Sequence, residues 1–310
     1  MSVFVTGATG TLGTHLVAAL PGDLIITSRN PAKARAAVTR GRVVGWDGES
    51  ALEAGVLDGV ETVIHLAGEP VAEGRWTPAK KERIEQSRIR STRELVRAME
   101  RAMPRPRVLV CASAVGIYGS RGDEILTEAS ARGEGFLASV CAAWEHEASR
   151  AETHGIRVVS LRIGIVLARE GGALAEMMPL FRTGLAGKLG DGRQWMPWIH
   201  VDDVIGLLLF AVNDDRVRGA LNACAPEPVT NATFTRAMGA ALHRPTFMTA
   251  PSALMRLALG EKADIVLASQ RVLPARALAL GYSFGHRSLD EALEDLVDAP
   301  AAAARAEAKG

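Results

Sequence analysis

The sequence predicts an α/β fold, a Rossmann-type doubly wound parallel sheet with a smaller C-terminal α/β region. Two observations lead to this prediction: short apolar, β-branched runs alternate with helical patterns, and a glycine-rich turn joins the first run to the first helix. Such an alternation is typical of a parallel sheet covered on both faces. The predicted strands are 3–6, 24–27, 43–46, 63–66, 108–111 and 158–161, and the predicted helices are 11–20, 31–39, 78–102 and 135–154.

The regular alternation of strand and helix patterns ends at about residue 165. A helical stretch begins at Gly171-Gly172, a glycine-rich loop covers 184–192, and further helices are expected near 202–212, 231–242, 251–259 and 287–297. We therefore predict a first domain over 1–165, with its sheet completed by part of 195–225. A smaller, substrate-facing region follows over 166–298, and 299–310 form a flexible tail.

Composition and charge exclude several classes of protein. The 36 Lys and Arg residues nearly balance the 35 Asp and Glu residues, so no basic excess points to nucleic acid. The sequence shows no secretory signal and no apolar run of membrane-spanning length. Its three cysteines form no CxxC pair, and its histidines form no HExxH motif. We expect a reduced, cytoplasmic protein that needs no metal and binds neither membrane nor nucleic acid.

The glycine turn predicts a dinucleotide site. Gly7 permits a tight turn directly after the first strand, Gly10 lets the backbone approach a pyrophosphate, and Gly13 allows close packing of helix and strand. The N-terminus of the helix then offers free N–H groups to phosphate. The other residues of the predicted site in this turn are Thr9, Thr11 and Leu12.

The end of the second predicted strand indicates which dinucleotide is bound. NAD-binding proteins usually hold the ribose hydroxyls there with Asp or Glu. This sequence instead has Ser28 and Arg29, and a guanidinium can bind a 2′-phosphate through two hydrogen bonds. We therefore predict NADP(H) as the cofactor, although Arg29 is also compatible with a solvated residue at a helix start.

A set of further motifs follows the glycine turn along the chain. The motifs are Leu66-Ala67-Gly68-Glu69-Pro70, Arg75-Trp76-Thr77, Ser87-Arg88, Ser113-Ala114-Val115-Gly116-Ile117-Tyr118-Gly119, Phe136-Leu137, Trp144-Glu145, Arg162-Ile163-Gly164-Ile165-Val166-Leu167, Gly171-Gly172-Ala173-Leu174, Gln194-Trp195-Met196-Pro197-Trp198-Ile199-His200-Val201-Asp202-Asp203 and Ser269-Gln270-Arg271-Val272-Leu273-Pro274. In this order they resemble the extended short-chain dehydrogenase/reductases, and within them the atypical "epimerase family" proteins with a C-terminal domain of unknown function. The resemblance spans essentially residues 2–297. It implies an NADP-binding domain with a small α/β cap, and it implies no substrate.

The resemblance also implies roles for individual residues. Ser28 and Arg29 would meet the 2′-phosphate, and Arg88 would reach back to the cofactor from the following long helix. Arg88 is also compatible with one of many solvated charges in its segment. Leu66, Ala67 and Gly68 would line the ribose and pyrophosphate, unless they are simply core at the end of a strand, and Arg162 to Val166 would form the wall near the nicotinamide.

The catalytic pair of the superfamily is absent. Its reductases usually move the substrate proton with a Tyr whose pKa is lowered by a Lys four residues later. The resemblance places Leu137 and Cys141 at these two positions, and the chain contains no Tyr-x-x-x-Lys. Without a Lys partner, the Tyr118 phenol should stay protonated and could only donate. Cys141 is interpreted as a small core residue rather than a nucleophile.

Two catalytic candidates remain. Ser113 closes the fifth strand, and Glu69 follows the Ala-Gly turn, where it could equally be a helix cap or a solvated loop residue. The function we predict is an NADP(H)-dependent oxidoreductase acting on an unidentified small, polar substrate. The alternatives are a sugar-nucleotide epimerase or dehydratase and a non-catalytic NADP(H) redox sensor. The oligomeric state is left open.

Overall fold

A seven-stranded parallel sheet organises the chain. The computed structural model describes residues 1–38 and 40–297. The strand order is β3-β2-β1-β4-β5-β7-β12, and every neighbouring pair is parallel, which confirms the predicted doubly wound α/β fold. The strands are β1 (Ser2–Thr6), β2 (Asp23–Ser28), β3 (Arg42–Gly45), β4 (Thr62–His65), β5 (Val108–Ala114), β7 (Arg157–Ile163) and β12 (Gly219–Ala223).

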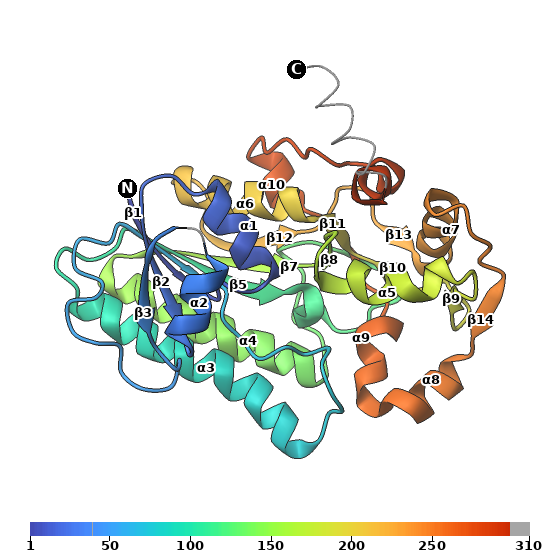
Figure 1. Cartoon of the computed structure of the whole chain (residues 1–310), viewed down its shortest axis with the longest axis horizontal. Coiled ribbons are helices and arrows are strands. Elements are labelled where there is room, and N and C mark those ends of the chain that lie inside the picture. The colour runs from blue at the N-terminus through green and yellow to red at the C-terminus, as the bar shows by residue number, and fades with distance from the viewer. Residues whose placement is uncertain (39, 298–310) are drawn as a thin grey trace.

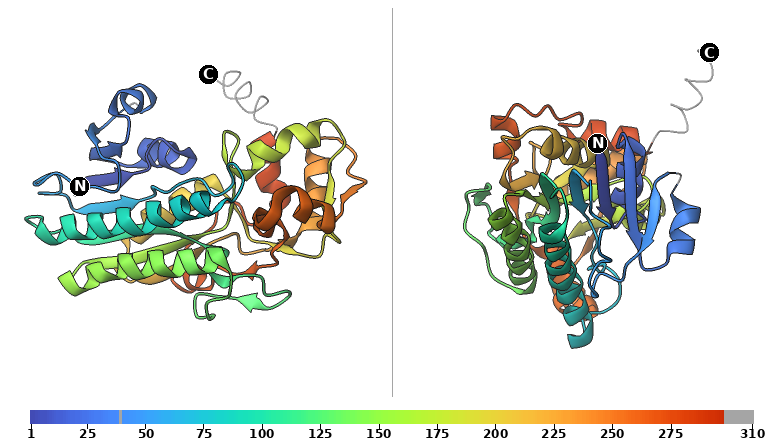
Figure 2. Two further views of the ribbon diagram at one scale, coloured as in Figure 1. Left: turned by 90° about the horizontal axis from the view of Figure 1, so that it is seen from below. Right: turned by 90° about the vertical axis from the view of Figure 1, so that its left-hand side faces the viewer.

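Helices cover both faces of the sheet. On one face, α1 (Thr11–Ala19) and α6 (Val201–Asn213) bury apolar side chains such as Leu16 and Leu208 against the strands. On the other face, α3 (Pro78–Arg101) and α4 (Phe136–Ser149) run side by side and bury Leu95 and Trp144 (Figure 2). This burial is the main reason that these segments stay helical, because isolated helices of this length are marginal in water.

Helix starts follow local chemistry. The side chains of Asn30 and Thr77 accept hydrogen bonds from the backbone N–H of Lys33 and Lys80, and a proline follows each cap. These caps begin α2 (Pro31–Ala37) and α3 close to the predicted positions. The caps therefore fix where the connections after β2 and β4 end and the helices α2 and α3 begin.

The C-terminal part forms a cap beside the sheet, on the right of Figure 1. Its core surrounds the fully buried Trp198 and includes Phe181 and Phe234. Its helices are α5 (Gly172–Arg182), α7 (Asn231–Ala241), α8 (Ser252–Leu259) and α9 (Asp264–Leu267), and a further helical segment occupies 289–297. Helix α10 (Ala275–Ala279) instead packs against β12, and its Ala277 belongs to the core of the sheet. Short strand pairs complete the cap: β8 (Ile165–Leu167) with β11 (Trp198–His200), β9 (Gly187–Leu189) with β14 (Met248–Ala250), β10 (Trp195–Met196) with β13 (Val229–Thr230), and β15 (Arg271–Val272) with β6 (Ile125–Leu126) of the first half.

The structure differs from the sequence prediction in the 184–192 loop. We predicted only a glycine-rich loop, but β9 lies within it and pairs with β14. The glycine itself explains the close pairing, because a Cβ at Gly187 would collide with the Met248 carbonyl. The predicted tail 299–310 lies outside the described residues, and the domain division at residue 165 stays a prediction. No helix in the described part of the chain is long and apolar enough to cross a membrane.

A buried arginine of β7 binds the segment that precedes β12. The guanidinium of Arg157 donates hydrogen bonds to the carbonyls of Ala211, Val212 and Val217, at 2.7, 2.9 and 2.9 Å. It also lies 3.2 Å from the carboxylate of Asp215. A side chain of the first half is thus satisfied by the segment that leads into the last strand of the sheet.

Candidate functional site

The predicted site residues lie at or near the carboxyl edge of the seven-stranded sheet. In a parallel sheet the carboxyl ends of all strands meet at the same edge, where ligands of doubly wound folds bind. The glycine turn follows β1, Ser28 ends β2 and Arg29 follows it, and Leu66 to Glu69 follow β4. Ser113 lies at the end of β5, Arg162 at the end of β7, Val166 in β8, and Arg88 in α3.

The glycine turn has the geometry that a dinucleotide needs. Gly7 has φ +74°, and a Cβ there would lie 2.8 Å from the amide nitrogen of Ala67. A Cβ at Gly13 would collide with the Gly7 carbonyl and with Ala8. At Gly10 a Cβ would meet only the Gly7 carbonyl oxygen, at 3.5 Å, so its outer side is open. The turn is closed on its inner side and accessible where a pyrophosphate would approach.

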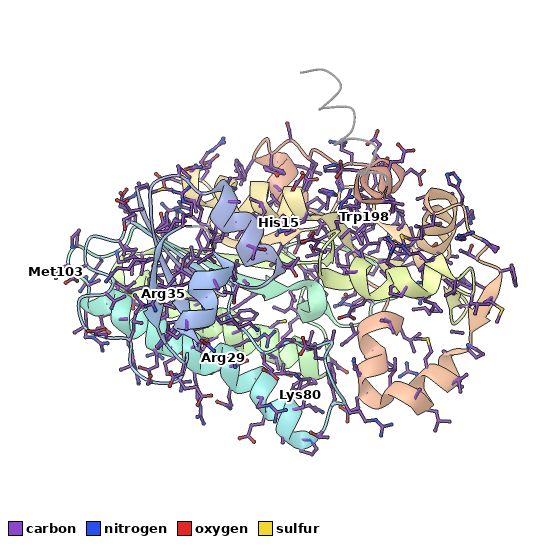
Figure 3. The ribbon with its side chains drawn as sticks, viewed as in Figure 1. His15, Arg29, Arg35, Lys80, Met103 and Trp198 are labelled. Atoms are coloured by element: carbon purple, nitrogen blue, oxygen red, sulfur yellow. The ribbon has the colours of Figure 1, made fainter. Side chains whose placement is uncertain are left out.

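The end of β2 presents a cation to solvent. Ser28 Oγ accepts a hydrogen bond from the Asn30 amide at 3.1 Å, which shapes the turn into α2. Arg29 is exposed, and its guanidinium makes no hydrogen bond or ion pair within the described residues. Figure 3 shows Arg29 on the same side of the molecule as Lys80 of α3. Arg29 is therefore available to an anionic ligand.

A buried histidine holds the peptide that packs against this turn. His65 Nε2 lies 3.1 Å from the hydroxyls of Ser91 and Thr92, and both hydroxyls already donate to carbonyls of α3. Nε2 must therefore donate, and Nδ1 accepts from the Thr6 hydroxyl at 2.6 Å. The Thr6 oxygen in turn accepts from the Ala67 amide at 3.2 Å. Neutral His65 thus fixes the position of Ala67 beside Gly7.

This histidine should make stability depend on pH. Burial, with the nearby charge of Arg88, lowers the pKa of His65 to about 3. The unfolded chain binds this proton below about pH 6.5, whereas the folded chain does not. The free energy of unfolding should therefore fall on acidification from about pH 6 to pH 4, by about 1.4 kcal/mol per pH unit from this residue.

Urea denaturation at several pH values would measure this slope. A His65→Asn variant should be less stable at pH 7 but should show a shallower decline over the same range. An unchanged slope in His65→Asn would contradict the assignment, because carboxylates alone would then account for the acid sensitivity.

Glu69 is held in an ion pair. Its carboxylate accepts a hydrogen bond from the buried Lys80 ammonium at 2.7 Å, and its amide donates to Ser87 Oγ at 3.0 Å. The hydrogen bond from Lys80 lowers the pKa of Glu69, and the charges of Arg83 and Arg29 act in the same direction. Glu69 is therefore ionised near neutral pH, and it is a weak base with no proton to donate.

Ser113 belongs to a second, separate polar network. Its hydroxyl donates to Glu145 at 2.6 Å, and Glu145 receives two hydrogen bonds of 2.9 Å from Arg162. Arg162 also donates to the Tyr118 hydroxyl, which donates to Asn222 at 2.7 Å. The network crosses from β5 through α4 and β7 to β12, so it fixes Ser113 and Arg162 at the carboxyl edge.

The environments of Tyr118 and Cys141 agree with non-catalytic roles. Tyr118 is fully buried, and burial raises its pKa, so the phenol stays protonated as expected. Its hydroxyl donates to Asn222, but it also accepts from Arg162, so the expectation that it only donates is wrong. Cys141 is buried in a cluster with Val115 and Leu126, and burial raises the pKa of its thiol to about 11. A protonated, buried thiol is a core residue rather than a nucleophile.

Arg88 is packed against the loop that follows β4, residues 66–69. Its Nη1 donates to the carbonyls of Glu69 and Ile84, at 3.0 and 2.9 Å, and its guanidinium lies 5.0 Å from the ring centre of Trp144. A Cβ at Gly68 would lie 3.0 Å from the guanidinium carbon. Arg88 is thus a positioned side chain at the carboxyl edge, not one of the solvated charges of α3.

One cluster of metal-ligating residue types lies in the cap, formed by His200, His286 and Asp295. His200 Nδ1 accepts a hydrogen bond from the Asp202 amide at 3.1 Å, so its Nε2 carries the hydrogen and lies 3.3 Å from Asp295. The two imidazole rings stack with centres 3.7 Å apart. With this tautomer His200 turns an N–H, not a lone pair, toward Asp295.

Comparison with known proteins agrees with this geometry. The model of the NAD dependent epimerase/dehydratase family matches residues 3–224, and a domain of unknown function, DUF1731, matches residues 250–296. The chain belongs to the NAD dependent epimerase/dehydratase family. The resemblance found in the sequence is thereby confirmed, including the C-terminal domain.

Individual relatives cover almost the whole chain. The epimerase family protein SDR39U1 homolog of Arabidopsis thaliana, named as chloroplastic, is 38% identical over 96% of this chain and 87% of its own. The epimerase family protein YfhF of Bacillus subtilis is 36% identical over 96% of this chain and 98% of its own. The crystal structure of human SDR39U1 (isoform 2) with NADPH superposes with a TM-score of 0.87 at 33% identity, covering 96% of this chain and 99% of that one.

Sequence reasoning missed several partners in the site. It assigned no role to His65, Lys80 or Asn222, and it used Glu145 only to align the missing pair. Each of these residues finds its partner through the fold, at separations such as the 104 residues between Tyr118 and Asn222. One of these contacts could have been suggested by the sequence. Ser113 and Trp144-Glu145 both belong to motifs of the resemblance, and the structure joins Ser113 to Glu145.

Proposed function

We propose that this protein is an NADP(H)-dependent oxidoreductase that acts on a small, polar carbonyl or hydroxyl compound. The observation that carries the proposal is the open turn at Gly10 together with the exposed guanidinium of Arg29. Family membership supports it, and so does the NADPH in the structure of human SDR39U1. The experiment that tests it is a screen of aldehydes, ketones and alcohols for compounds that make the purified protein oxidise NADPH or reduce NADP⁺.

The residues at the carboxyl edge fit this cofactor. The turn from Gly7 to Gly13 and the first amides of α1 would hold the pyrophosphate. Ser28 and Arg29 would hold the 2′-phosphate, since β2 ends without a carboxylate that would repel it. The chain's other proposed contacts are Leu66, Ala67, Gly68, Arg88, Arg162 and Val166, all placed on the loops and elements at this edge.

Proton handling is where this protein differs from its superfamily. NADPH supplies the hydride that reduces a substrate carbon, and the protein must supply or hold the proton at the substrate oxygen. Ser113 is the proposed hydrogen-bonding group, but its own hydrogen is engaged by Glu145. Glu69, the other candidate, is ionised and paired with Lys80. Proton transfer assisted by such groups should be slow, and a water held by Ser113 is the remaining donor.

The absence of the acid–base pair favours a second candidate. This candidate is a protein that binds NADP(H) without turnover and reports the redox state of the cofactor to a partner. Leu137 and Cys141 stand where an acid–base pair would be, and Ser113 already has an internal acceptor. A sugar-nucleotide epimerase or dehydratase would also have to move protons, so the missing pair counts against it equally. Tight NADPH binding with no compound that accelerates NADPH oxidation would favour the redox sensor.

Four substitutions should separate the candidate groups once a substrate is found. Ser113→Ala should lower the single-turnover rate of NADPH oxidation most, because one positioned proton-handling group contributes roughly 10²–10⁴ in rate. Glu69→Gln should also lower this rate, because it removes the ion pair with Lys80 that holds the loop after β4, residues 66–69. Tyr118→Phe and Cys141→Ala should leave the rate nearly unchanged and lower only stability.

Thermal melting of the four variants provides the control, since a rate loss that follows a stability loss is structural. If Cys141→Ala loses its activity with the fold intact, the thiol is not a core residue. If neither Ser113→Ala nor Glu69→Gln slows the reaction, both proposed groups are excluded.

A further inference from the structure

The outer edge of strand β14 lies open on the rim of the cap. Strand β14 pairs with β9 on one side, and no other strand in the described part of the chain pairs with it. Figure 1 shows β14 at the right-hand rim of the molecule. We propose that this edge binds an acidic peptide segment in extended conformation, as an added β-strand. The edge lies outside the proposed cofactor site, so the inference goes beyond the proposed function.

The pairing with β9 determines which backbone groups of β14 face outward. The carbonyl of Ala250 accepts a hydrogen bond from the Gly190 amide at 2.8 Å. The carbonyl of Met248 is the group that a Cβ at Gly187 would meet, so it also faces β9. In a parallel ladder the N–H and C=O of one residue face one neighbour, and those of the next residue face the other side. The N–H and C=O of Thr249 therefore point away from β9, toward the open edge.

Only one edge of this strand pair is open. At the other edge, the amide of Leu189 in β9 donates to the side chain of Asn231 at the start of α7, at 2.8 Å. Strand β14 has no such cover, and the side chains of Phe247 and Met248 beside it are 76% and 47% exposed. An uncovered edge that carries apolar side chains is a template for a further strand.

The segment that presents this edge is held at both ends. At its start, the Arg244 amide donates to the Gly239 carbonyl at 2.9 Å. Gly239 also lies against Thr246, because a Cβ there would be 2.6 Å from the Thr246 methyl group. At its end, Ala250 is bonded to β9. A peptide would thus meet a preformed edge, and binding would not have to order the segment first.

A basic groove borders the edge, between α7 and residues 244–249. It consists of two hollows of about 530 and 230 Å³, which share Arg236 and Thr246 in their linings. The linings also include the exposed Lys188 and Arg244, and none of the described lining residues is Asp or Glu. Ion pairs within the described residues of the cap involve other side chains. The three cations are therefore available to carboxylates of a ligand.

These cations decide between a second copy of the chain and an acidic partner. If two copies paired through β14 about a two-fold axis, Lys188, Arg236 and Arg244 would face the same cations of the second copy. Like charges that face each other across strands are destabilising. An added strand with acidic residues at alternate positions carries all its carboxylates on one face, where they can meet the groove.

Fluorescence polarisation with a designed probe tests the proposal. The probe is a fluorescein-labelled peptide of about eight residues in which Glu alternates with Val, long enough to cover the open edge. It should bind the native protein with a Kd below about 100 µM. Raising NaCl from about 50 to about 500 mM should weaken binding at least about fivefold. A Lys-Val peptide should not bind, and a Glu-Pro peptide, which keeps the charge but lacks half of the N–H donors, should bind at least about tenfold more weakly.

Variants of the groove test the same assignment from the protein side. Arg236→Glu/Arg244→Glu should weaken binding of the Glu-Val peptide at least about tenfold, and Phe247→Ser at least about threefold, since the added strand would cover that ring. The matched control is Arg101→Glu/Arg287→Glu, which makes the same change in net charge at two exposed arginines outside the groove and should change binding less than about twofold. The affinity for NADPH and the melting temperature should stay at native values in Arg236→Glu/Arg244→Glu.

Several outcomes would overturn the proposal. They are no binding of the Glu-Val peptide to the native protein, an equal loss in the two double variants, and equal affinities for the Glu-Val and Glu-Pro peptides. The peptide comparison needs no variant, so it holds even if a charge reversal does not fold. A native dimer in analytical ultracentrifugation that Phe247→Ser dissociates would make the edge an interface between copies instead. None of these results would alter the proposed function, which NADPH binding and oxidation test separately.

Discussion

Gly10→Val is expected to abolish binding of NADPH, with Kd rising by about a hundredfold or more, equivalent to about 2.7 kcal/mol. The branched side chain would occupy the open outer side of the turn, where the pyrophosphate must approach. The fold should survive, because Gly10 has φ −84° and ψ 172°, a conformation that valine adopts readily. Fluorescence titration of NADPH together with a thermal melt measures both effects.

A neighbouring glycine provides the contrast. Gly13→Val should destabilise the protein itself, because its Cβ would collide with the Gly7 carbonyl and with Ala8. Loss of binding at position 10 with normal stability, and loss of stability at position 13, would distinguish ligand access from packing. Native NADPH affinity in a folded Gly10→Val protein would mean that the cofactor does not lie on this turn.

Arg29→Asp is expected to erase or invert the cofactor preference. The native protein should bind NADPH at least about tenfold more tightly than NADH, a difference of about 1.4 kcal/mol. The substitution replaces a cation that can bind the 2′-phosphate with a carboxylate that repels it and can hold ribose hydroxyls instead. Because Arg29 is exposed and has no partner within the described chain, the change should leave the melting temperature nearly constant.

Titration of both nucleotides against native and variant protein gives the test. Arg35, a basic residue in the last turn of α2, is a suitable control, and Arg35→Asp should keep most of the preference. Equal affinities of the native protein for NADPH and NADH would contradict the proposal that the residues at the end of β2 select the 2′-phosphate.

The sheet and its helices were predictable because their signals are local. Apolar, β-branched runs marked β1, β2, β3, β4, β5 and β7, and the helical patterns between them marked α1, α2, α3 and α4. The short strands of the cap were not predicted, since strands such as β9 and β14 have only three residues each. Strands that short carry no periodicity, and their existence depends on partners distant in the sequence.

The site shows the same division between local and distant signals. The glycine turn and the residue ending β2 are local features, so their positions could be predicted from sequence. The ion pair of Glu69 with Lys80, and the tautomer of His65, depend on which helix face meets which strand. Sequence alone therefore left Glu69 open as a base, whereas the structure shows its ionised carboxylate in an ion pair with Lys80.

The buried contacts of Arg157 have a consequence for how the chain assembles. Strand β7 gains its outer neighbour only when β12, more than fifty residues later, has been made, and the three carbonyls that satisfy Arg157 belong to the same late segment. A fragment ending near residue 165 would expose the outer edge of β7 and would leave Arg157 without these three carbonyl partners. The sheet of the first half is therefore completed only when the chain has been made as far as residue 223.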